Sequence, residues 1–409
     1  MGARALAVIL LAAACTSPGP SVATPTPTAE PGVVSVTALL DLSGPRASVG
    51  AQQRNALQLW TEQHPRATPP VRLKVVDVAG SDARLLIELK RAATEDLADA
   101  VIVGAPVVYD DTFGRAVDLA ALPVMLAQPV AADPAGRAGG RWAFALAPSL
   151  ARLAAALVDD AVRRGVLVPS LALSDARDRV DPVTATLAAE LEKRDLEPLT
   201  RITIGTDGTI PPVVRSSLSV LRSVQCFAPL PVCAAIAREA RSSGSPLMLY
   251  LPYGTSTNDQ LKDDRDLALR AVWPSSRTLI PPTVLRTDED HARAAFAKDY
   301  SARFGARPDI HAAIAYDALS LLADAAGRAG ADDRGAQRDA LERITIPLIA
   351  STYTFAQDRH AGPDGTDVAY LRWDLGAPAL APLFGTVAPT PTPSPAPART
   401  ASPSPSATR

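Results

Sequence analysis

The sequence predicts an α/β protein made of two doubly wound parallel-sheet lobes joined by a multi-strand hinge. Segments typical of strands and segments typical of helices alternate along most of the chain. The length of 409 residues is sufficient for two domains. An apolar fraction of 47%, against 21% charged residues, provides enough material for buried cores. Alternation of this kind favours parallel sheets that are covered by helices on both faces.

The first run of alternating segments begins at Val33. β-Branched and apolar residues at 33–40 predict a strand, and the turn-like Ser43-Gly44-Pro45 follows it. Ala56, Leu57 and Trp60 share one face of the next predicted helix. In order, we predict a strand at 33–40, a helix at 50–62, a strand at 71–78, a helix at 83–96, a strand at 100–103, a helix at 112–121 and a strand at 123–126.

A second, similar run begins after Pro148. Its predicted helices are 150–164, 182–194 and 232–241, and its predicted strands are 170–173, 199–204, 221–227 and 246–251. Further helices are predicted at 288–304, 309–329 and 334–344, with Gly330 as a helix stop, and a last strand at 367–373. Because such segments return late in the chain, we expect several crossings between the lobes. The predicted bounds are 33–145 and 276–346 for lobe 1, and 146–275 and 347–386 for lobe 2.

Residues 1–15 resemble the signal peptide and lipobox of a bacterial lipoprotein. Arg4 precedes an apolar run, 5–14, that is too short to span a bilayer as a permanent helix. The run ends at Ala12-Ala13-Ala14-Cys15, with Ala12 where a lipobox usually has Leu. The alternative is an ordinary secretory signal with an incidental cysteine. We predict that Cys15 is lipidated and that the protein is extracytoplasmic and lipid-anchored to the cell membrane.

Lipidation of Cys15 would leave Cys226 and Cys233 as a pair in an oxidising compartment. The six residues between them form a segment short enough to be closed by a disulfide. No histidine is close enough in sequence to complete a metal site with them. We favour a disulfide between Cys226 and Cys233 over two free thiols.

The predicted folded region lies between two segments rich in Pro, Thr, Ser and Ala. Residues 16–32 are predicted to be an extended tether, and 387–409 a disordered tail. Neither segment has enough large apolar residues to offset the entropy lost on ordering.

The composition and motifs argue against several classes of function. A formal net charge of −2 provides no basic surface for a nucleic acid. The sequence has no Gly-x-Ser-x-Gly elbow, no Walker loop and no Gly-x-Gly-x-x-Gly motif. His64, His291, His311 and His360 are not spaced as metal ligands, and His311, inside a helical pattern, is expected to be a packing or surface residue. We therefore expect a protein that is not an enzyme and that has no metal or cofactor.

Three stretches resemble the branched-chain-amino-acid-type binding proteins of bacterial ABC importers, which have the type I periplasmic-binding-protein fold. They are Leu42-Ser-Gly-Pro-Arg-Ala-Ser-Val-Gly50, Val101-Ile-Val-Gly-Ala-Pro106, and the sequence from Ala295 to Pro308 followed by Ala312-Ala-Ile-Ala-Tyr-Asp-Ala318. The resemblance covers about Val33 to Phe384. It implies capture of a small solute in a cleft between the lobes, lobe closure, and delivery to an ABC permease. It implies no catalytic residue.

The resemblance also suggests where the ligand would lie. The loop that matches 44–50 lines the cleft in this family, so Ser48 and Val49 are candidate ligand neighbours. The alternative for Ser48 is a tight loop that only needs glycine at both ends. The α-carboxylate of an amino acid is usually held by Ser or Thr hydroxyls after the third and fourth strands. This chain has Val108 or Tyr109 after the third strand, and Ala127 and Gln128 after the fourth.

A second departure concerns the ligand's ammonium group, which an acid after a second-lobe strand usually meets. Here that strand, 247–251, is followed by Pro252-Tyr253-Gly254. A zwitterion enclosed in a dry cleft would pay several kcal/mol for each unmatched charge. Micromolar capture supplies only about 8 kcal/mol. We therefore predict that free α-amino acids are poor ligands.

Four residues are instead predicted to form an aromatic, weakly polar pocket, namely Tyr109, Gln128, Phe227 and Tyr253. Such a pocket would suit an uncharged or aromatic solute. The alternative for the aromatic residues is packing at strand ends. Two other functions also remain open on the same fold: a receptor that senses a ligand for a membrane kinase or a cell-wall enzyme, and a protein-interaction module that has lost its ligand.

Overall fold

The computed structural model describes most of the chain between Glu30 and Leu380. The described residues are 30–168, 170–175, 182–197, 199–205, 209–255, 261, 263–276, 279–280, 286–363, 368–374 and 377–380. The predicted lipidation site Cys15, most of the predicted tether and the predicted tail 387–409 lie outside them. None of the described helices is long and apolar enough to cross a membrane.

Lobe 1 is built on a five-stranded parallel sheet with the order β2-β1-β3-β4-β5. Its strands are β1 (Val34–Leu40), β2 (Val71–Asp77), β3 (Ala100–Val103), β4 (Val124–Leu126) and β5 (Ala143–Ala145). Between them run α1 (Ala47–Gln63), α2 (Asp82–Thr94) and α3 (Asp111–Ala120). The chain later returns to this lobe with α10 (Asp288–Phe304), α11 (Ile310–Ala329), α12 (Arg334–Leu341) and the hairpin β11 (Thr345–Pro347) and β12 (Thr352–Thr354).

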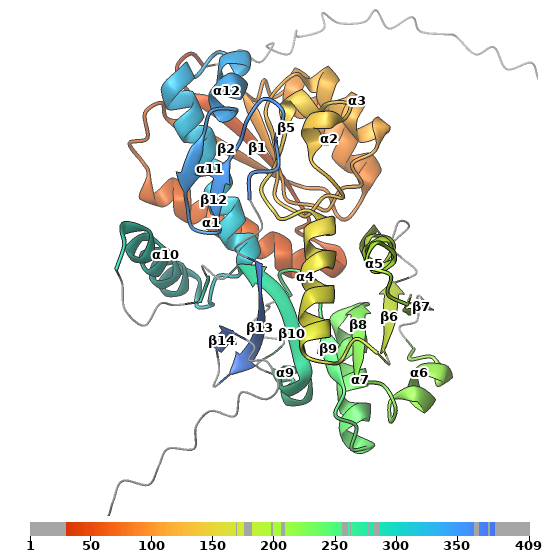
Figure 1. Ribbon diagram of the computed structural model, residues 1–409. Coiled ribbons are helices and arrows are strands. Elements are labelled where there is room, and N and C mark those ends of the chain that lie inside the picture. Colours follow the sequence, from red (N-terminus) through yellow and green to blue (C-terminus); the bar gives the residue numbers. More distant parts are fainter. Residues whose placement is uncertain are drawn as a thin grey trace, which may run out of the picture.

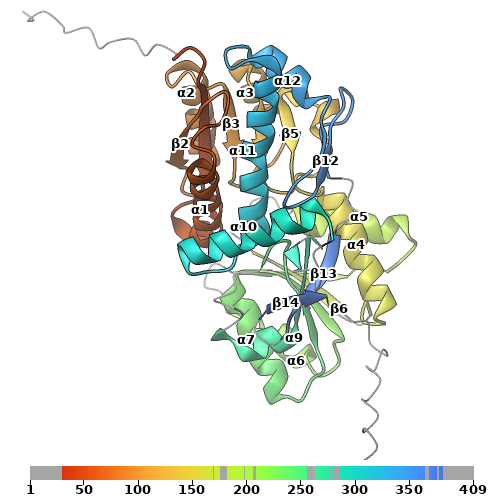
Figure 2. The same cartoon turned by 90° about the vertical axis from the view of Figure 1, so that its left-hand side faces the viewer.

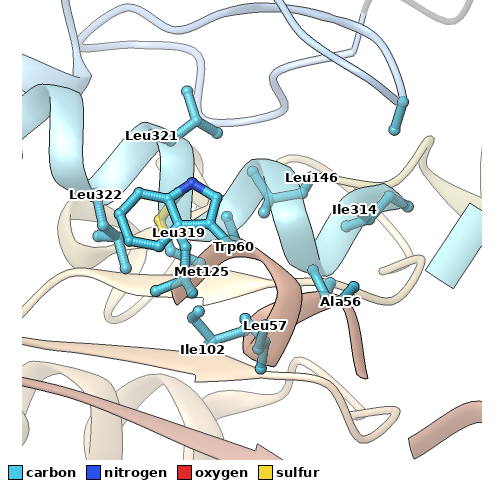
Figure 3. Packing of buried hydrophobic residues seen from close by; sticks show 14 of the residues in the cluster. Ala56, Leu57, Trp60, Ile102, Met125, Leu146, Ile314, Leu319, Leu321 and Leu322 are labelled. Carbon is cyan, nitrogen blue, oxygen red and sulfur yellow. The ribbon is translucent and has the colours of Figure 1, made fainter. Parts of the chain in front are cut away.

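The sheet of lobe 1 separates two apolar clusters. Alternate residues of β1 point to opposite faces, so Ala38 and Leu40 join one cluster and Leu39 joins the other. The first cluster lies under α1 and α11, which run side by side in Figures 1 and 2. Figure 3 shows Trp60 of α1 among the leucines of α11. The second cluster lies under α2 and α3. Helices therefore cover both faces of the sheet, as the sequence predicts.

Lobe 2 repeats this arrangement and adds two strands. Its parallel part has the order β7-β6-β8-β9-β10, which is the strand order of lobe 1, and the antiparallel strands β13 and β14 continue beyond β10. The strands are β6 (Ser170–Asp175), β7 (Thr200–Ile204), β8 (Ser223–Phe227), β9 (Met248–Tyr250), β10 (Ala271–Ser276), β13 (Val368–Asp374) and β14 (Ala377–Leu380). The helices are α4 (Leu150–Arg163), α5 (Pro182–Lys193), α6 (Pro212–Ser217), α7 (Leu230–Ser242) and α9 (Arg265–Arg270).

The described elements place three passages of the chain between the lobes: after β5, after β10, and between Pro363 and Val368. The last passage comes later than the expected boundary at 346/347. Tyr353 and Phe355 are buried in the lobe 1 cluster under α11, and Ala361 pairs with Ala145 of β5. Residues 347–363 therefore belong to lobe 1, because their apolar side chains complete the core of that lobe.

The interior of lobe 2 contains a charged pair. Asp160 and Arg164, one turn apart on α4, form two hydrogen bonds, from Arg164 Nε to Oδ2 at 2.6 Å and from Nη2 to Oδ1 at 3.0 Å. The hydroxyl of Tyr250 donates to the same Oδ2 at 2.8 Å. Both charged residues are buried, and the aspartate oxygens are satisfied by donors.

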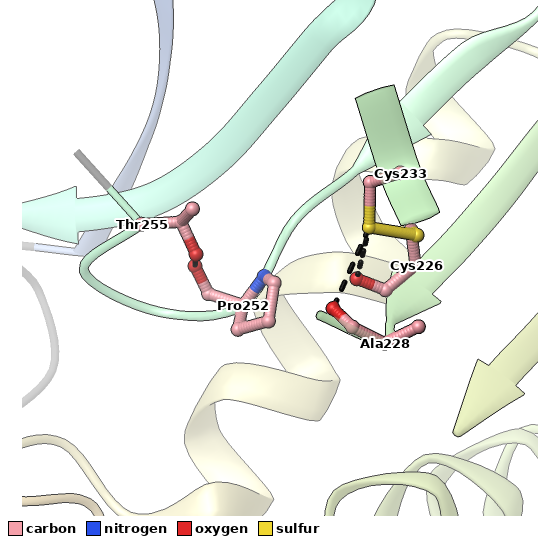
Figure 4. Close-up of a disulfide and its surroundings, with 5 residues drawn as sticks. All are labelled: Cys226, Ala228, Cys233, Pro252 and Thr255. Atoms are coloured by element: carbon pink, nitrogen blue, oxygen red, sulfur yellow. Dashed lines mark hydrogen bonds between the residues drawn. A yellow bond between two sulfur atoms is a disulfide. The ribbon is translucent and has the colours of Figure 1, made fainter. Parts of the chain in front are cut away.

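The disulfide between Cys226 and Cys233 is present, as predicted. It joins the carboxyl end of β8 to the first turn of α7, with the two Cα atoms 6.0 Å apart (Figure 4). Cys233 Sγ also lies 3.5 Å from the carbonyl oxygens of Cys226 and Ala228. Because a disulfide sulfur carries no hydrogen, we regard these as close contacts. The bridge fixes the turn from strand to helix at one end of the lobe 2 sheet.

Candidate functional site

The two lobes meet where the loop after β9 reaches the start of α11. Gly254, in that loop, has a φ of +72°. A Cβ atom at this position would lie 2.3 Å from His311 Nε2 and 2.7 Å from Ile310 Cγ2. The backbone of lobe 2 is therefore in direct contact with the imidazole of His311 in lobe 1.

The position of His311 follows from how α11 begins. The side chain of Asp309 caps the helix by accepting a hydrogen bond from Ala312 N at 3.0 Å. This cap places His311 in the first helical turn, next to the residues that follow β4. Gln128 is one of these residues, and its Nε2 lies 3.1 Å from His311 Nδ1. Because an amide nitrogen only donates, Nδ1 accepts this hydrogen bond and Nε2 carries the ring proton.

His311 is a neutral donor in this environment. Its side chain is 4% exposed. Burial, together with the nearby positive charge of Arg46, lowers the pKa of His311 to about 4. The imidazole is therefore uncharged at neutral pH. The ring lies against Gly254 of the other lobe, where an added Cβ atom would be 2.3 Å from His311 Nε2.

Tyr253 contributes an aromatic ring from lobe 2. The ring meets the imidazole of His311 edge-on, with centroids 6.4 Å apart and an interplanar angle of 89°. Tyr253 also packs against the apolar cluster of lobe 1. The structure therefore brings Gln128 and Tyr253, both predicted from the sequence, to the same imidazole.

A small cavity lies beside this contact, at the hinge. Its volume is about 10 Å³, which is room for about one water molecule. Residues of both lobes line it, including Tyr253, Ser275 and Ile314. The hydroxyl of Ser275 is buried and has no hydrogen-bond partner among the described residues.

The other residues predicted for the pocket lie elsewhere. Ser48 and Val49 lie in the first turn of α1 and not in a loop, because this helix begins three residues before its predicted start. The side chain of Ser48 is exposed and that of Val49 is half-buried. Val108 is exposed, and Ala127 is fully buried in the lobe 1 cluster under α11.

Tyr109 and Phe227 fit the packing interpretation. The ring of Tyr109 is buried edge-on against Phe113, and its hydroxyl donates to the carbonyl of Ala138 at 3.1 Å within lobe 1. Phe227 packs against the apolar cluster under α4 and α5 of lobe 2. Neither contact is with the opposite lobe.

Sequence reasoning missed His311 and Gly254 as site residues. The position of His311 two residues after the helix cap Asp309 was a usable signal, because it places the side chain in the first turn of α11. The contact of Gly254 with His311 joins residues far apart in the sequence, and no local pattern predicts it.

The comparison with known families agrees with this architecture. Residues 33–378 match the family model described as periplasmic binding protein. The chain belongs to this family. This is a family of substrate-binding proteins and not a family of enzymes. No curated protein matches the chain by sequence.

Solved structures of the same fold cover nearly the same region. An extracellular ligand-binding receptor from Rhodopseudomonas palustris HaA2 is 18% identical with a TM-score of 0.72, covering 85% of this chain and 99% of the receptor. A leucine-binding protein from Thermotoga maritima is 15% identical with a TM-score of 0.70 (85% and 98% covered). A solute-binding protein of an R. palustris ABC transporter, in complex with benzoate, is 16% identical with a TM-score of 0.69 (85% and 95%). At these identities the similarity establishes the type I periplasmic-binding-protein fold and nothing about the ligand.

Proposed function

We propose that this protein is an extracytoplasmic solute-binding lipoprotein that captures a small molecule between its lobes for an ABC importer. The solute is uncharged or aromatic rather than a free α-amino acid. The observation that carries the proposal is the contact between lobes, in which a neutral Gln128–His311 pair of lobe 1 faces the aromatic ring of Tyr253 from lobe 2. This is a set of polar and aromatic groups without a full charge.

The residues after β3 and β4 support the exclusion of α-amino acids. The hydroxyl of Tyr109 donates to Ala138 inside lobe 1, and Ala127 has no side-chain donor. The amide nitrogen of Gln128 is engaged with His311. The side chains at these positions therefore do not form a hydroxyl clamp for an α-carboxylate. A dehydrated carboxylate without such partners loses several kcal/mol of solvation that is not regained.

Binding of defined solutes tests the ligand class. Calorimetric titrations with leucine, glutamate, benzoate and benzamide would be compared with mass spectrometry of any small molecule that copurifies. We expect the uncharged aromatic benzamide to bind, benzoate to bind more weakly because its carboxylate lacks the same hydroxyl partners, and both amino acids to show no heat at millimolar concentration. Micromolar binding of leucine or glutamate would reject the proposed ligand class, because it would require partners for the α-carboxylate that the side chains after β3 and β4 do not provide.

Anchoring and transport are tested in the source cell. A Cys15→Ser variant should be released from the membrane fraction and should no longer incorporate labelled fatty acid, since Cys15 is the proposed acylation site. Deletion of the protein should abolish high-affinity uptake of the copurified solute. Membrane retention of the Cys15→Ser variant would reject the lipid anchor, and unchanged uptake would favour a sensing role.

A further inference from the structure

Residues 246–248, at the start of β9, line a pocket of about 460 Å³ together with the last turn of α7 and with α9. β9 begins at this pocket with Met248 and runs toward the contact between the lobes, where Gly254 follows it. Figure 1 shows α7 and α9 in the lower part of lobe 2, away from lobe 1. The pocket therefore lies apart from the contact between the lobes, and its volume is within the range of roughly 300–1,000 Å³ that is typical of small-molecule sites.

The lining of this pocket is positively charged, in a chain whose formal net charge is −2. It contains Arg241, Arg265 and Arg270 but only one acid, Asp266. Asp266 Oδ1 accepts a hydrogen bond from Arg241 Nη1 at 2.9 Å, so these two charges neutralise each other. The two acids just before α9 are not part of the lining. Among the described residues no acid forms an ion pair with Arg265 or Arg270, which leaves two positive charges at the pocket without a counter-charge there.

The guanidinium group of Arg270 is already fixed at the pocket wall. Its Nη1 donates to the carbonyl oxygen of Ser245 at 2.6 Å and to that of Leu247 at 3.3 Å, and the residue is half-buried. These carbonyls orient the group without neutralising its charge. A guanidinium has five N–H donors, and the two hydrogen bonds use only those of Nη1. An oxyanion can therefore be bound by a group that needs little reorientation.

The rest of the lining is largely apolar. Leu247 and Met248 are buried, and Leu269 of α9 is 72% exposed. A single exposed leucine is common on protein surfaces. Here it stands beside two other apolar side chains and beside arginines without a counter-charge. An apolar group that entered the pocket together with an anionic one would remove these side chains from water.

We propose that this pocket is a second binding site, which holds a small organic oxyanion. Its phosphate or carboxylate group lies between Arg265 and Arg270, since guanidinium groups bind such oxygens in a bidentate way. Its apolar part lies against Met248 and Leu269. A neutral molecule of the same shape leaves both charges uncompensated, and an inorganic anion leaves the apolar side chains in water. The inference is independent of the proposed function, because none of these residues belongs to the contact between the lobes.

The methionines provide a direct test, since the chain has only three of them and Met248 lines the pocket. Met125, in the core of lobe 1, is the internal reference. With carbon-13 in the methionine methyl groups, phenyl phosphate should shift the signal of Met248 in a saturable way and leave that of Met125 in place. Inorganic phosphate should require a much higher concentration for the same shift, and neutral benzyl alcohol should cause none.

Variants separate the charge from the apolar contact. Arg265→Gln changes an exposed side chain and should fold like the wild type, but the dissociation constant of phenyl phosphate should rise about tenfold, because charge-assisted hydrogen bonds are lost. Arg115→Gln, at an exposed position of α3 in lobe 1, changes the net charge equally and should bind like the wild type. Leu269→Ser should weaken the binding of phenyl phosphate and leave that of inorganic phosphate unchanged.

Several outcomes would overturn the assignment. An unmoved Met248 signal would reject the site. Equal weakening by Arg265→Gln and Arg115→Gln would reject the role of Arg265, because only the net charge would then matter. Equal affinities for phenyl phosphate and inorganic phosphate would reject the apolar contact. Sedimentation of the protein with vesicles that contain phosphatidic acid, without a response to phenyl phosphate, would reject a soluble anion in favour of a lipid headgroup.

The same experiments keep this site distinct from the proposed function. If benzamide fails to bind and the Met248 signal still responds to phenyl phosphate, only the proposed solute class is rejected. If benzamide binds and the Met248 signal responds to no anion, only the second site is rejected.

Discussion

The carboxyl group of Asp317, on α11, should contribute strongly to the stability of lobe 1. The side chain is fully buried. It accepts hydrogen bonds from Ile349 N at 3.0 Å, from Ala350 N at 2.7 Å and from the hydroxyl of Tyr353 at 3.2 Å. Ala350 in turn accepts a hydrogen bond from Ser276 of lobe 2 at 2.7 Å. Asp317 therefore holds the segment of lobe 1 on which the hinge strand β10 rests.

Two substitutions give different expected losses. In Asp317→Asn one of the two carboxyl oxygens becomes an NH2 group, so the donors that contact that oxygen lose their acceptor. Leaving a buried donor unsatisfied should lower the free energy of unfolding by about 1–3 kcal/mol. In Asp317→Ala three donors lose their acceptor, and the free energy of unfolding should fall by roughly 3 kcal/mol or more. Urea unfolding followed by circular dichroism measures both losses.

The control lies on the same helix. Asp324 forms an exposed pair with Arg328 one turn away, so Asp324→Asn should change the free energy of unfolding by less than about 0.5 kcal/mol. If Asp317→Asn and Asp324→Asn lower the free energy of unfolding by the same amount, the assignment of Asp317 as the anchor of residues 349–353 is wrong.

The cost of Asp317→Asn should also depend on pH. Burial raises the pKa of Asp317 from 3.8 to about 7. The folded state therefore keeps this proton at pH values where the unfolded state has lost it. The contribution to stability is complete below about pH 4 and is lost as the pH rises through 7. Because asparagine does not titrate, the difference between the wild type and Asp317→Asn should be larger at pH 5 than at pH 8. A constant difference would contradict the raised pKa.

Three further outcomes are expected. Arg164→Met should lower the free energy of unfolding by about 3–5 kcal/mol in urea melts, because the buried Asp160 carboxylate loses its charge partner; a loss below 1 kcal/mol would contradict this. Replacing Cys226 and Cys233 together by serine should lower the free energy of unfolding by about 2 kcal/mol, as expected for so short a loop. Denaturant unfolding of the wild type with and without reductant measures the same loss. The pKa of His311 is lowered to about 4, so its contribution to stability is lost as the pH falls from 6.5 through 4, and its NMR ring signals should stay those of neutral imidazole down to pH 5.

Long elements with a continuous apolar face are where sequence and structure agree best. The predicted helix 288–304 coincides with α10, and the predicted strand 100–103 coincides with β3. The prediction for α11 is one residue too long, because Asp309 caps the helix from outside it. In these elements local propensity, periodicity and capping indicate the same structure.

Short elements were missed because tertiary pairing defines them. β10 contains Pro274, which is unusual inside a sheet. Its pairing with β9 ends at Val272, and the carbonyl of Pro274 accepts a hydrogen bond from Gly254 instead. The missing N–H of Pro274 therefore costs no bond between strands. The sequence of one strand does not show where a neighbouring strand ends.

The candidate site was predicted in part for the same reason. The spacing of strands and loops indicated that Gln128 and Tyr253 lie at strand ends, and both reach the contact between lobes. The same reasoning could not tell that Tyr109 turns back into its own lobe, since its direction depends on the position of Ala138. His311 was expected to be a packing residue because its helical pattern carries no information about the loop of the opposite lobe.

The three passages of the chain between the lobes determine when each lobe can be completed. Lobe 1 needs α11 and residues up to 363, and the lobe 2 sheet needs β13 and β14. Neither lobe is a continuous stretch of sequence, so a chain that emerges amino end first cannot finish either one until almost all of it is available. Truncation shortly before Val368 would leave lobe 2 without its last two strands and would expose the edge of β10 to pairing with other chains.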